Sequence, residues 1–162
     1  MKLRSANPDD IGQLAEIWHI GWQDTHAPLL PEELARYRTV ENFRKLLAAN
    51  LPNVVIAEKD SVIIGLCITK ADELFQLYIT AEARGTGVGV LLLNDAERRL
   101  AADGNDVAWL ACAIGNDRAA RFYEKHGWHL ARTFLAQVPA ADGTFPLEVW
   151  RFEKTLSRNR ER

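Results

Sequence analysis

A glycine-rich turn stands where the chain passes from an apolar stretch to a helical one. It spans residues 84–89 and reads RGTGVG. Residues 73–80 before it alternate and are largely apolar, which is typical of a buried strand, and apolar residues recur at helical spacing through 88–100 after it. Glycines let a backbone approach a ligand closely, and the unpaired N–H groups and positive dipole of a helix start attract an anion. The chemistry that this pattern predicts is the binding of a phosphate or pyrophosphate.

Three kinds of phosphate loop compete for this turn, and their spacing separates them. A nucleoside-triphosphate loop needs a Lys after its last glycine, and no Lys follows here. A dinucleotide fingerprint that begins at Gly85 has Val90 in place of its third glycine, and the next strand ends without the acidic ribose partner. The remaining pattern is R-x-x-G-x-G, formed by Arg84, Gly87 and Gly89.

This pattern resembles the acetyl-CoA pyrophosphate loop of the GNAT-type N-acetyltransferases, Q/R-x-x-G-x-G/A, which directly follows their central strand. A second segment, NDRAARFYEKHGW at residues 116–128, resembles the family's N-x-x-A-x-x-F-Y-E-x-x-G-F/W motif at the expected distance downstream. The resemblance covers residues 2–155, with the specific motifs inside 72–130. It implies a GNAT-like acyl-CoA N-acyltransferase fold of the α/β (mixed α+β) class. A central mixed sheet of about seven strands with a splayed parallel pair would be flanked by about four to five helices.

The resemblance also implies how acetyl-CoA is held. Backbone groups of Leu77, Tyr78 and Ile79 would hold the pantetheine arm and the acetyl carbonyl, with the arm inserted between two splayed strands like a missing strand. The loop would hold the pyrophosphate through Arg84, Gly85, Thr86, Gly87, Val88, Gly89 and Val90. Asn116 would add a side-chain contact to CoA, although by itself it is also a typical helix N-cap. The glycines have a plainer alternative too, an ordinary strand-to-helix turn.

Acetyl transfer needs a neutral amine, hydrogen-bond donors for the oxyanion, and a proton for the departing thiolate. A backbone N–H near Ile79 is a candidate oxyanion donor. Tyr123 looks like the family's general acid, because a phenol with a pKa of about 10 is protonated at neutral pH and can donate to a thiolate whose thiol has a pKa of about 8.5. The alternative is that Tyr123 only packs against the domain.

The general base is harder to assign. Several family members carry a glutamate on the strand that precedes the second motif, and this chain has Ala111 there. The best remaining carboxylate is Glu73, at the start of the central strand, with His26 and Asp24 as candidates in a loop. A charged residue at a strand end is often only solvated surface, and deprotonation through water needs no dedicated side chain.

Aromatic residues in the first third of the chain are candidates for the acceptor site. In the family this part lies over the acceptor groove, so Trp22, His26 and Tyr37 are expected to line it, although the two larger rings alternatively just pack helix against sheet. His126 and His129 lie close together, but no cysteine or carboxylate set completes a ligand group, so we expect no metal.

Composition sets the class of protein. A chain of 162 residues with 48% apolar and 26% charged residues fits one globular domain, expected over 1–156 with a polar tail at 157–162. A net charge of −2 indicates neither a nucleic-acid partner nor an anionic membrane. The N-terminus lacks a signal-like apolar run and no stretch is long enough to span a bilayer, so we expect a cytoplasmic protein. Cys67 and Cys112 lie in apolar runs and are expected as buried free thiols.

Periodicity and turn residues predict the elements that carry these side chains. Helices are expected from the Asn7-Pro8 start to Trp22, from Pro31 to Tyr37, and over 40–49, 88–102 and 116–126. Strands are expected near Leu3 and over 54–59, 62–70, 73–80, 107–113, 128–138 and 145–155. The 73–80 and 107–113 strands should be parallel because a helix connects them. The last two should form a hairpin whose edge allows a homodimer.

The leading hypothesis is therefore an N-acetyltransferase that passes an acetyl group from acetyl-CoA to a primary amine of a small molecule by direct attack, with Tyr123 as general acid. One alternative is a non-catalytic module that binds and senses acyl-CoA. Another is a protein N-terminal acetyltransferase, whose peptide substrate would need an open groove.

Overall fold

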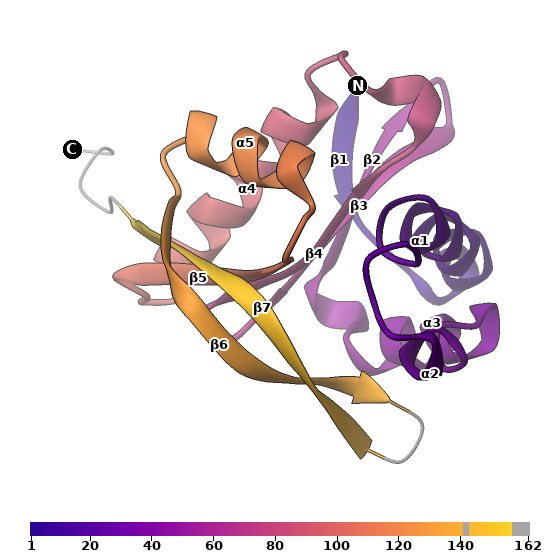
Figure 1. Cartoon of the computed structure of the whole chain (residues 1–162). Helices are drawn as coiled ribbons and strands as arrows, with labels where there is room; N and C mark the ends of the chain where they lie inside the picture. Colours follow the sequence, from indigo (N-terminus) through magenta and orange to yellow (C-terminus); the bar gives the residue numbers. More distant parts are fainter. Residues whose placement is uncertain (141–142, 157–162) are drawn as a thin grey trace.

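A mixed sheet of seven strands runs through the molecule in the order β1-β2-β3-β4-β5-β7-β6, and the computed structural model describes residues 1–140 and 143–156. Its strands are β1 (Lys2–Ser5), β2 (Val54–Lys59), β3 (Val62–Lys70), β4 (Glu73–Ile79), β5 (Val107–Ala113), β6 (His129–Ala140) and β7 (Gly143–Thr155). Helices α1 (Ile11–Thr25), α2 (Glu32–Ala35) and α3 (Val40–Ala49) cover one face, and α4 (Val88–Ala102) and α5 (Asp117–Lys125) cover the other (Figure 1). The expected GNAT-like α/β fold is confirmed.

Two apolar clusters, one on each face of the sheet, hold these layers together. Leu14, Trp18 and Phe43 of α1 and α3 pack on the Ile56 and Leu66 side of the strands. The apolar stripe of α4 packs on the opposite side, together with Cys67, Leu74 and Phe152. Neighbouring residues of a strand point to opposite faces, so adjacent Leu66 and Cys67 serve different clusters. Both cysteines are buried and free, as expected.

The parallel pair that the sequence predicts is short and splayed. Glu73 and Trp109 are the one residue pair that joins β4 to β5 in the described chain, supported by a hydrogen bond from the Trp109 N–H to the Asp72 carbonyl (3.2 Å). On its other side, β4 carries a bulge, because Thr69 pairs with Leu74 while Ile68 pairs with Gln76, which leaves Phe75 as the extra residue. A bulge bends its strand, so β4 turns away from β5 beyond Glu73.

The C-terminal hairpin is longer than expected. Its strands reach Ala140 and begin again at Gly143, where the sequence predicted a turn over 139–143. Proline has no N–H to donate and is therefore tolerated in a sheet only where a strand has a free edge. Pro139 lies on the edge strand β6, and Pro146 lies on the part of β7 that extends past β5. The hairpin therefore projects beyond the sheet and reaches toward α2 (Figure 1). The turn residues 141–142 and the expected tail 157–162 lie outside the described residues.

The start of the first helix follows its sequence signal. The Asn7 side chain accepts a hydrogen bond from the Asp9 N–H, and the Asp10 carboxylate accepts one from the Asn7 N–H, which together form a capping box. Arg4 of β1 pairs with Asp10 at 2.9 Å and so ties this start to the sheet. No described helix is both long enough and apolar enough to cross a membrane.

Candidate active site

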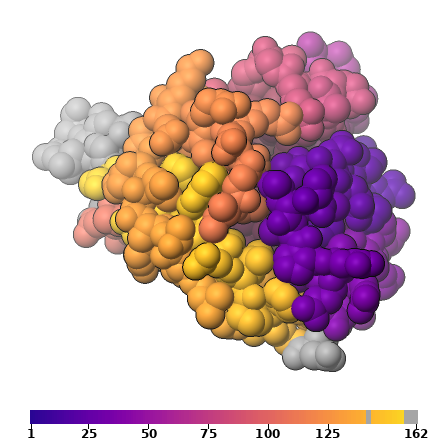
Figure 2. All heavy atoms as spheres, viewed as in Figure 1, coloured from indigo at the N-terminus to yellow at the C-terminus, as the bar shows by residue number. Residues whose placement is uncertain are grey.

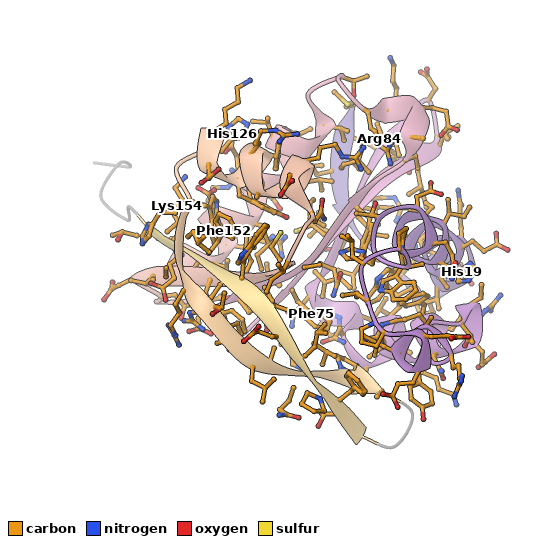
Figure 3. The ribbon with its side chains drawn as sticks, in the orientation of Figure 1. His19, Phe75, Arg84, His126, Phe152 and Lys154 are labelled. Carbon is orange, nitrogen blue, oxygen red and sulfur yellow. The ribbon has the colours of Figure 1, made fainter. Side chains whose placement is uncertain are left out.

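A cleft of about 460 Å³ opens where β4 ends, between the glycine-rich loop and α5. Figure 3 places Arg84, before α4, and His126, after α5, on the same side of the molecule, and both line this cleft. Of the residues assigned to acetyl-CoA from the sequence, its lining includes Leu77, Tyr78, Ile79, Arg84, Gly85, Gly87, Val88, Gly89, Val90, Asn116 and Tyr123. Thr86 is outside this lining, and its hydroxyl donates to the Ala83 carbonyl. The fold thus gathers the two sequence motifs around one cavity.

The glycines of the loop serve two different physical needs. Gly85 and Gly87 have φ angles of 80° and 91°, in the left-handed region that side chains with a Cβ rarely adopt. Gly87 is also the residue before the first turn of α4, whose N–H groups have no partner within the helix and whose residues Val88, Gly89 and Val90 line the cleft. Gly89 lies within the helix, where a Cβ would come within 3.4 Å of the Phe122 ring. The sequence predicted close approach to a ligand at Gly89, and the structure adds close packing of α4 against α5.

Tyr123 projects from α5 into the gap between the splayed strands. It lines both the cleft and a smaller cavity of about 80 Å³ between β4 and β5. Aromatic rings surround it, with the centroids of Phe122, Trp128 and Phe152 at 5.4, 6.1 and 6.3 Å. Burial raises the pKa of its phenol above the ordinary value, so the hydroxyl is protonated throughout the neutral range.

The position of Asn116 is compatible with both roles that the sequence left open. Its side-chain oxygen accepts a hydrogen bond from the Ala119 N–H at 3.3 Å, so it is the N-cap of α5. The same residue lines the cleft and the gap between the strands. Its amide nitrogen is therefore available to a ligand while its amide oxygen caps the helix.

A second large cavity of about 490 Å³ lies between the N-terminal helices and the C-terminal hairpin. We call it the acceptor cavity. In Figure 2 the indigo and purple first third of the chain lies directly beside the yellow and orange hairpin. Trp22, His26 and Glu73 line this cavity, whereas Tyr37 and Asp24 line neither it nor the other two cavities. The structure therefore brings together some of the sequence candidates and leaves those two outside.

Tyr78 and His26 connect the three cavities, since both residues line each of them. The Tyr78 hydroxyl lies 3.2 Å from His26 Nδ1. Gly21 makes room for the tyrosine, because a Cβ there would come within 2.5 Å of the Tyr78 ring. The three cavities therefore adjoin one another at Tyr78 and His26, in a row from the loop to the acceptor cavity, and we call this row the channel.

The titratable groups of the acceptor cavity differ in their protonation. Burial raises the pKa of Glu73 to about 7, opposed by Lys70 and Arg151 and reinforced by Asp72. Burial, and then the nearby Arg38 charge, lower the pKa of His26 to about 4, so its ring is neutral at pH 7. Glu73 is the better match to a general base near neutral pH, because it exchanges its proton in that range.

Sequence reasoning missed the remaining groups of this cavity. Arg38 lies between α2 and α3, and its Nη1 donates to the carbonyl of Pro139. Trp109 and Phe134 pack edge to face at 5.8 Å on β5 and β6 and also line the cavity. No local pattern marks these residues, because they meet only when the C-terminal hairpin reaches the N-terminal helices. Within residues 1–140 and 143–156, no three His, Cys, Asp or Glu side chains gather into a possible metal site.

Comparison with known proteins gives consistent matches. The model of the family described as "Acetyltransferase (GNAT) family" matches residues 14–128. An uncharacterized N-acetyltransferase of Archaeoglobus fulgidus is 29% identical over 135 residues, which cover 76% of this chain and 89% of that protein. The structure of a GCN5-related N-acetyltransferase from Rhodopseudomonas palustris has a TM-score of 0.76 at 22% identity, covering 96% of this chain and 95% of that one. PaiA N-acetyltransferase from Thermoplasma acidophilum, in complex with coenzyme A, has a TM-score of 0.68 at 22% identity and covers 95% and 98%.

Proposed function

The chain belongs to the GNAT family of acetyltransferases, and we propose that it transfers an acetyl group from acetyl-CoA to a primary amine of a small molecule. One observation carries this proposal. The cleft at the glycine-rich loop, the gap between β4 and β5 and the acceptor cavity adjoin one another at Tyr78 and His26. A thioester held in the gap would meet an amine that enters from the acceptor cavity, and the amine would attack the thioester carbonyl directly.

Acetyl-CoA fits the first half of this channel. Leu77 and Tyr78 line the gap and Ile79 lines the cleft, and none of the three is paired with β5, so their backbone offers hydrogen-bonding groups to the amide-rich pantetheine arm. The free N–H groups at the start of α4, with Arg84 beside them, suit the pyrophosphate. A PaiA N-acetyltransferase of the same fold was solved in complex with coenzyme A, which supports the assignment of this cosubstrate.

Tyr123 is proposed as the general acid. In the described chain its hydroxyl has no hydrogen-bond partner, so its proton is free for the sulfur of the departing CoA. Attack of the amine on the acetyl carbon forms a tetrahedral intermediate. Its collapse breaks the carbon–sulfur bond, and the phenol proton converts the thiolate into the thiol.

Glu73 is proposed as the general base, acting through water. It precedes Leu77 by four residues, which is about 13 Å along an extended strand and less across the bulge. The Glu73 carboxylate is therefore too far from an amine at the thioester for direct contact, and ordered water in the acceptor cavity would carry the proton to it. Its raised pKa keeps the carboxylate basic enough to hold that proton.

We expect Glu73→Gln to lower kcat by about 100-fold, because the amide cannot take up a proton. In the wild type, activity should rise with pH through about 7 as the carboxylate ionises, and this limb should be missing from the variant. Initial rates measured between pH 5.5 and 9 test both expectations. An unchanged acidic limb in the variant would assign the titration to another group.

The same substitution has a predictable effect on stability, which serves as its control. The pKa of Glu73 is higher in the folded chain than its ordinary value of 4.5, so the folded state retains the proton better than the unfolded state does. The free energy of unfolding should therefore decrease as pH rises from 4.5 to about 7, and Glu73→Gln should remove that contribution. A variant that is as stable as the wild type or more so at pH 8 shows that lost activity is not lost folding.

The experiment that tests the proposed function is a panel of primary amines assayed with acetyl-CoA and detection of the released thiol. The proposal expects amine-dependent thiol release and an acetylated product identified by mass spectrometry. Acetyl-CoA binding without transfer to any amine or peptide N-terminus would favour the acyl-CoA-sensing alternative. Transfer to peptides only would favour the protein N-terminal acetyltransferase.

The acceptor cavity favours a small molecule over a peptide. The hydrogen bond from Arg38 to the Pro139 carbonyl joins the helical side of this cavity to the hairpin side. A peptide backbone running through the cavity would have to displace that connection, whereas a small amine would not. A homodimer stays a prediction, supported by the position of β6, which has β7 as its one partner strand in the described sheet.

A further inference from the structure

Arg38 is a partly buried cation that has no carboxylate partner in the described chain. A guanidinium has five N–H donors, and the hydrogen bond to the Pro139 carbonyl accounts for one of them. The side chain also lines the acceptor cavity. Removing an unpaired charge from water is costly, so a partly buried arginine normally has an acidic partner.

The other arginines of similar burial show what is missing. Four arginines of the described chain are partly buried, and the other three each have a carboxylate. Arg4 pairs with Asp10 at 2.9 Å, Arg99 with Asp95 at 2.8 Å, and Arg151 with Glu153 at 2.7 Å. Arg38 forms no such pair with any residue of 1–140 or 143–156.

Glu73 lines the same cavity but does not supply the missing partner. The charges that act on its carboxylate are those of Lys70, Asp72 and Arg151. The charge that acts on Arg38 is that of Tyr78, a phenol that burial keeps neutral. Arg38 therefore faces a cavity that Lys70 and Glu73 also line, and whose aromatic and aliphatic residues include Trp22, Phe75, Trp109, Phe134 and Leu147.

We propose that the acceptor amine carries a carboxylate, which binds the Arg38 guanidinium, and an apolar body, which packs on the aromatic wall of the acceptor cavity. This inference rests on the proposed function and names its substrate class. The planar fork of a guanidinium pairs with a carboxylate through two parallel hydrogen bonds. Lys70, the other cation of this lining, acts on Glu73, which leaves the single charge of Arg38 for the acceptor and favours a carboxylate over a phosphate dianion. Arg38 and Tyr78 line the same cavity and Tyr78 also lines the gap, so an anchored carboxylate leaves the amine on the side of the thioester.

The test uses three acceptors of matched shape, phenylalanine, phenylalaninamide and phenethylamine, with acetyl-CoA. We expect kcat/KM of the wild type to be about 100-fold higher for phenylalanine than for either analogue without a carboxylate, because those analogues leave the Arg38 charge unpaired. Arg38→Gln should lower kcat/KM for the acid by about 100-fold and change it little for the amide, and Arg38→Lys should restore part of the loss. Arg36→Gln removes an equal charge from an exposed position nearby and should preserve the preference.

The outcomes separate this inference from the proposed function. Acetylation of all three amines without preference for the acid would overturn the carboxylate assignment while upholding the acetyltransferase. If Arg38→Gln lowered kcat/KM equally for the acid and the amide, Arg38 would only hold the hairpin in place, and the carboxylate assignment would be overturned as well. Better turnover of the phosphonate analogue of phenylalanine than of the acid would reassign the anion. The Kd for acetyl-CoA and the melting temperature of each variant show that the first half of the channel and the fold are intact.

Discussion

Replacing Tyr123 with phenylalanine is expected to lower kcat for acetyl transfer by about 100-fold or more while leaving the Kd for acetyl-CoA nearly unchanged. The phenylalanine ring keeps the contacts with Phe122, Trp128 and Phe152 and removes only the hydroxyl. Without that proton the CoA thiolate must leave as an anion. Single-turnover rates and isothermal titration calorimetry with acetyl-CoA measure the two quantities separately.

Tyr37→Phe is the matched control, because Tyr37 lies outside the three cavities and the same hydroxyl is removed. Its turnover should equal that of the wild type. A Tyr123→Phe enzyme that is as active as the wild type with several amines would show that Tyr123 only packs. Since burial raises the pKa of this phenol, the wild type should also show no alkaline loss of activity from Tyr123 up to pH of about 10.

Gly87→Val is expected to weaken acetyl-CoA binding by at least about 100-fold, because it alters both the conformation and the space of the loop. Gly87 has a φ of 91°, which a β-branched residue adopts only with strain. Relief of that strain would turn the first N–H groups of α4 away from the cleft. Calorimetry and thermal shift with acetyl-CoA test this expectation, and Gly89→Glu, which adds a negative charge at the same place, should act in the same direction.

Gly104→Val separates loss of the loop from general backbone strain. Gly104 has a φ of 98° and, like Gly87, has open space around its Cβ position, but it lies beyond the other end of α4. This variant should lose comparable stability, on the order of 1–3 kcal/mol, and keep its affinity for acetyl-CoA. Tight binding by the Gly87→Val variant would overturn the assignment of the loop to the pyrophosphate.

Much of the fold was predictable because its signals are local. The strands at 54–59, 62–70 and 107–113 and the helices at 40–49 and 88–102 have the bounds that their periodicity and end residues predict. The lining of the cleft was predictable for the same reason, since its glycines and Asn116 belong to two short sequence motifs. The splay of β4 and β5 came from the family resemblance, and the bulge at Phe75 that produces it has no signal in the sequence.

The acceptor half was less predictable because it forms from residues that are distant in the chain. Arg38 and Pro139 are 101 residues apart, and nothing near either one marks the contact. Asp24 belongs to α1 instead of the expected loop, Tyr37 follows α2, and neither side chain lines the cavity. Glu73 was identified by its place at the start of a strand, whereas the burial that raises its pKa depends on the whole surrounding structure.

The channel past Tyr78 and His26 has a consequence for the order of events in turnover. Under the proposed function, acetyl-CoA occupies the cleft and the amine occupies the acceptor cavity, so both substrates can be bound at once and neither has to leave before the other enters. No covalent acyl-enzyme intermediate is then needed between two half-reactions. Free CoA can leave through the cleft and the acetylated amine through the acceptor cavity. Double-reciprocal plots of initial rate against the concentration of one substrate, at several concentrations of the other, should therefore intersect instead of running parallel.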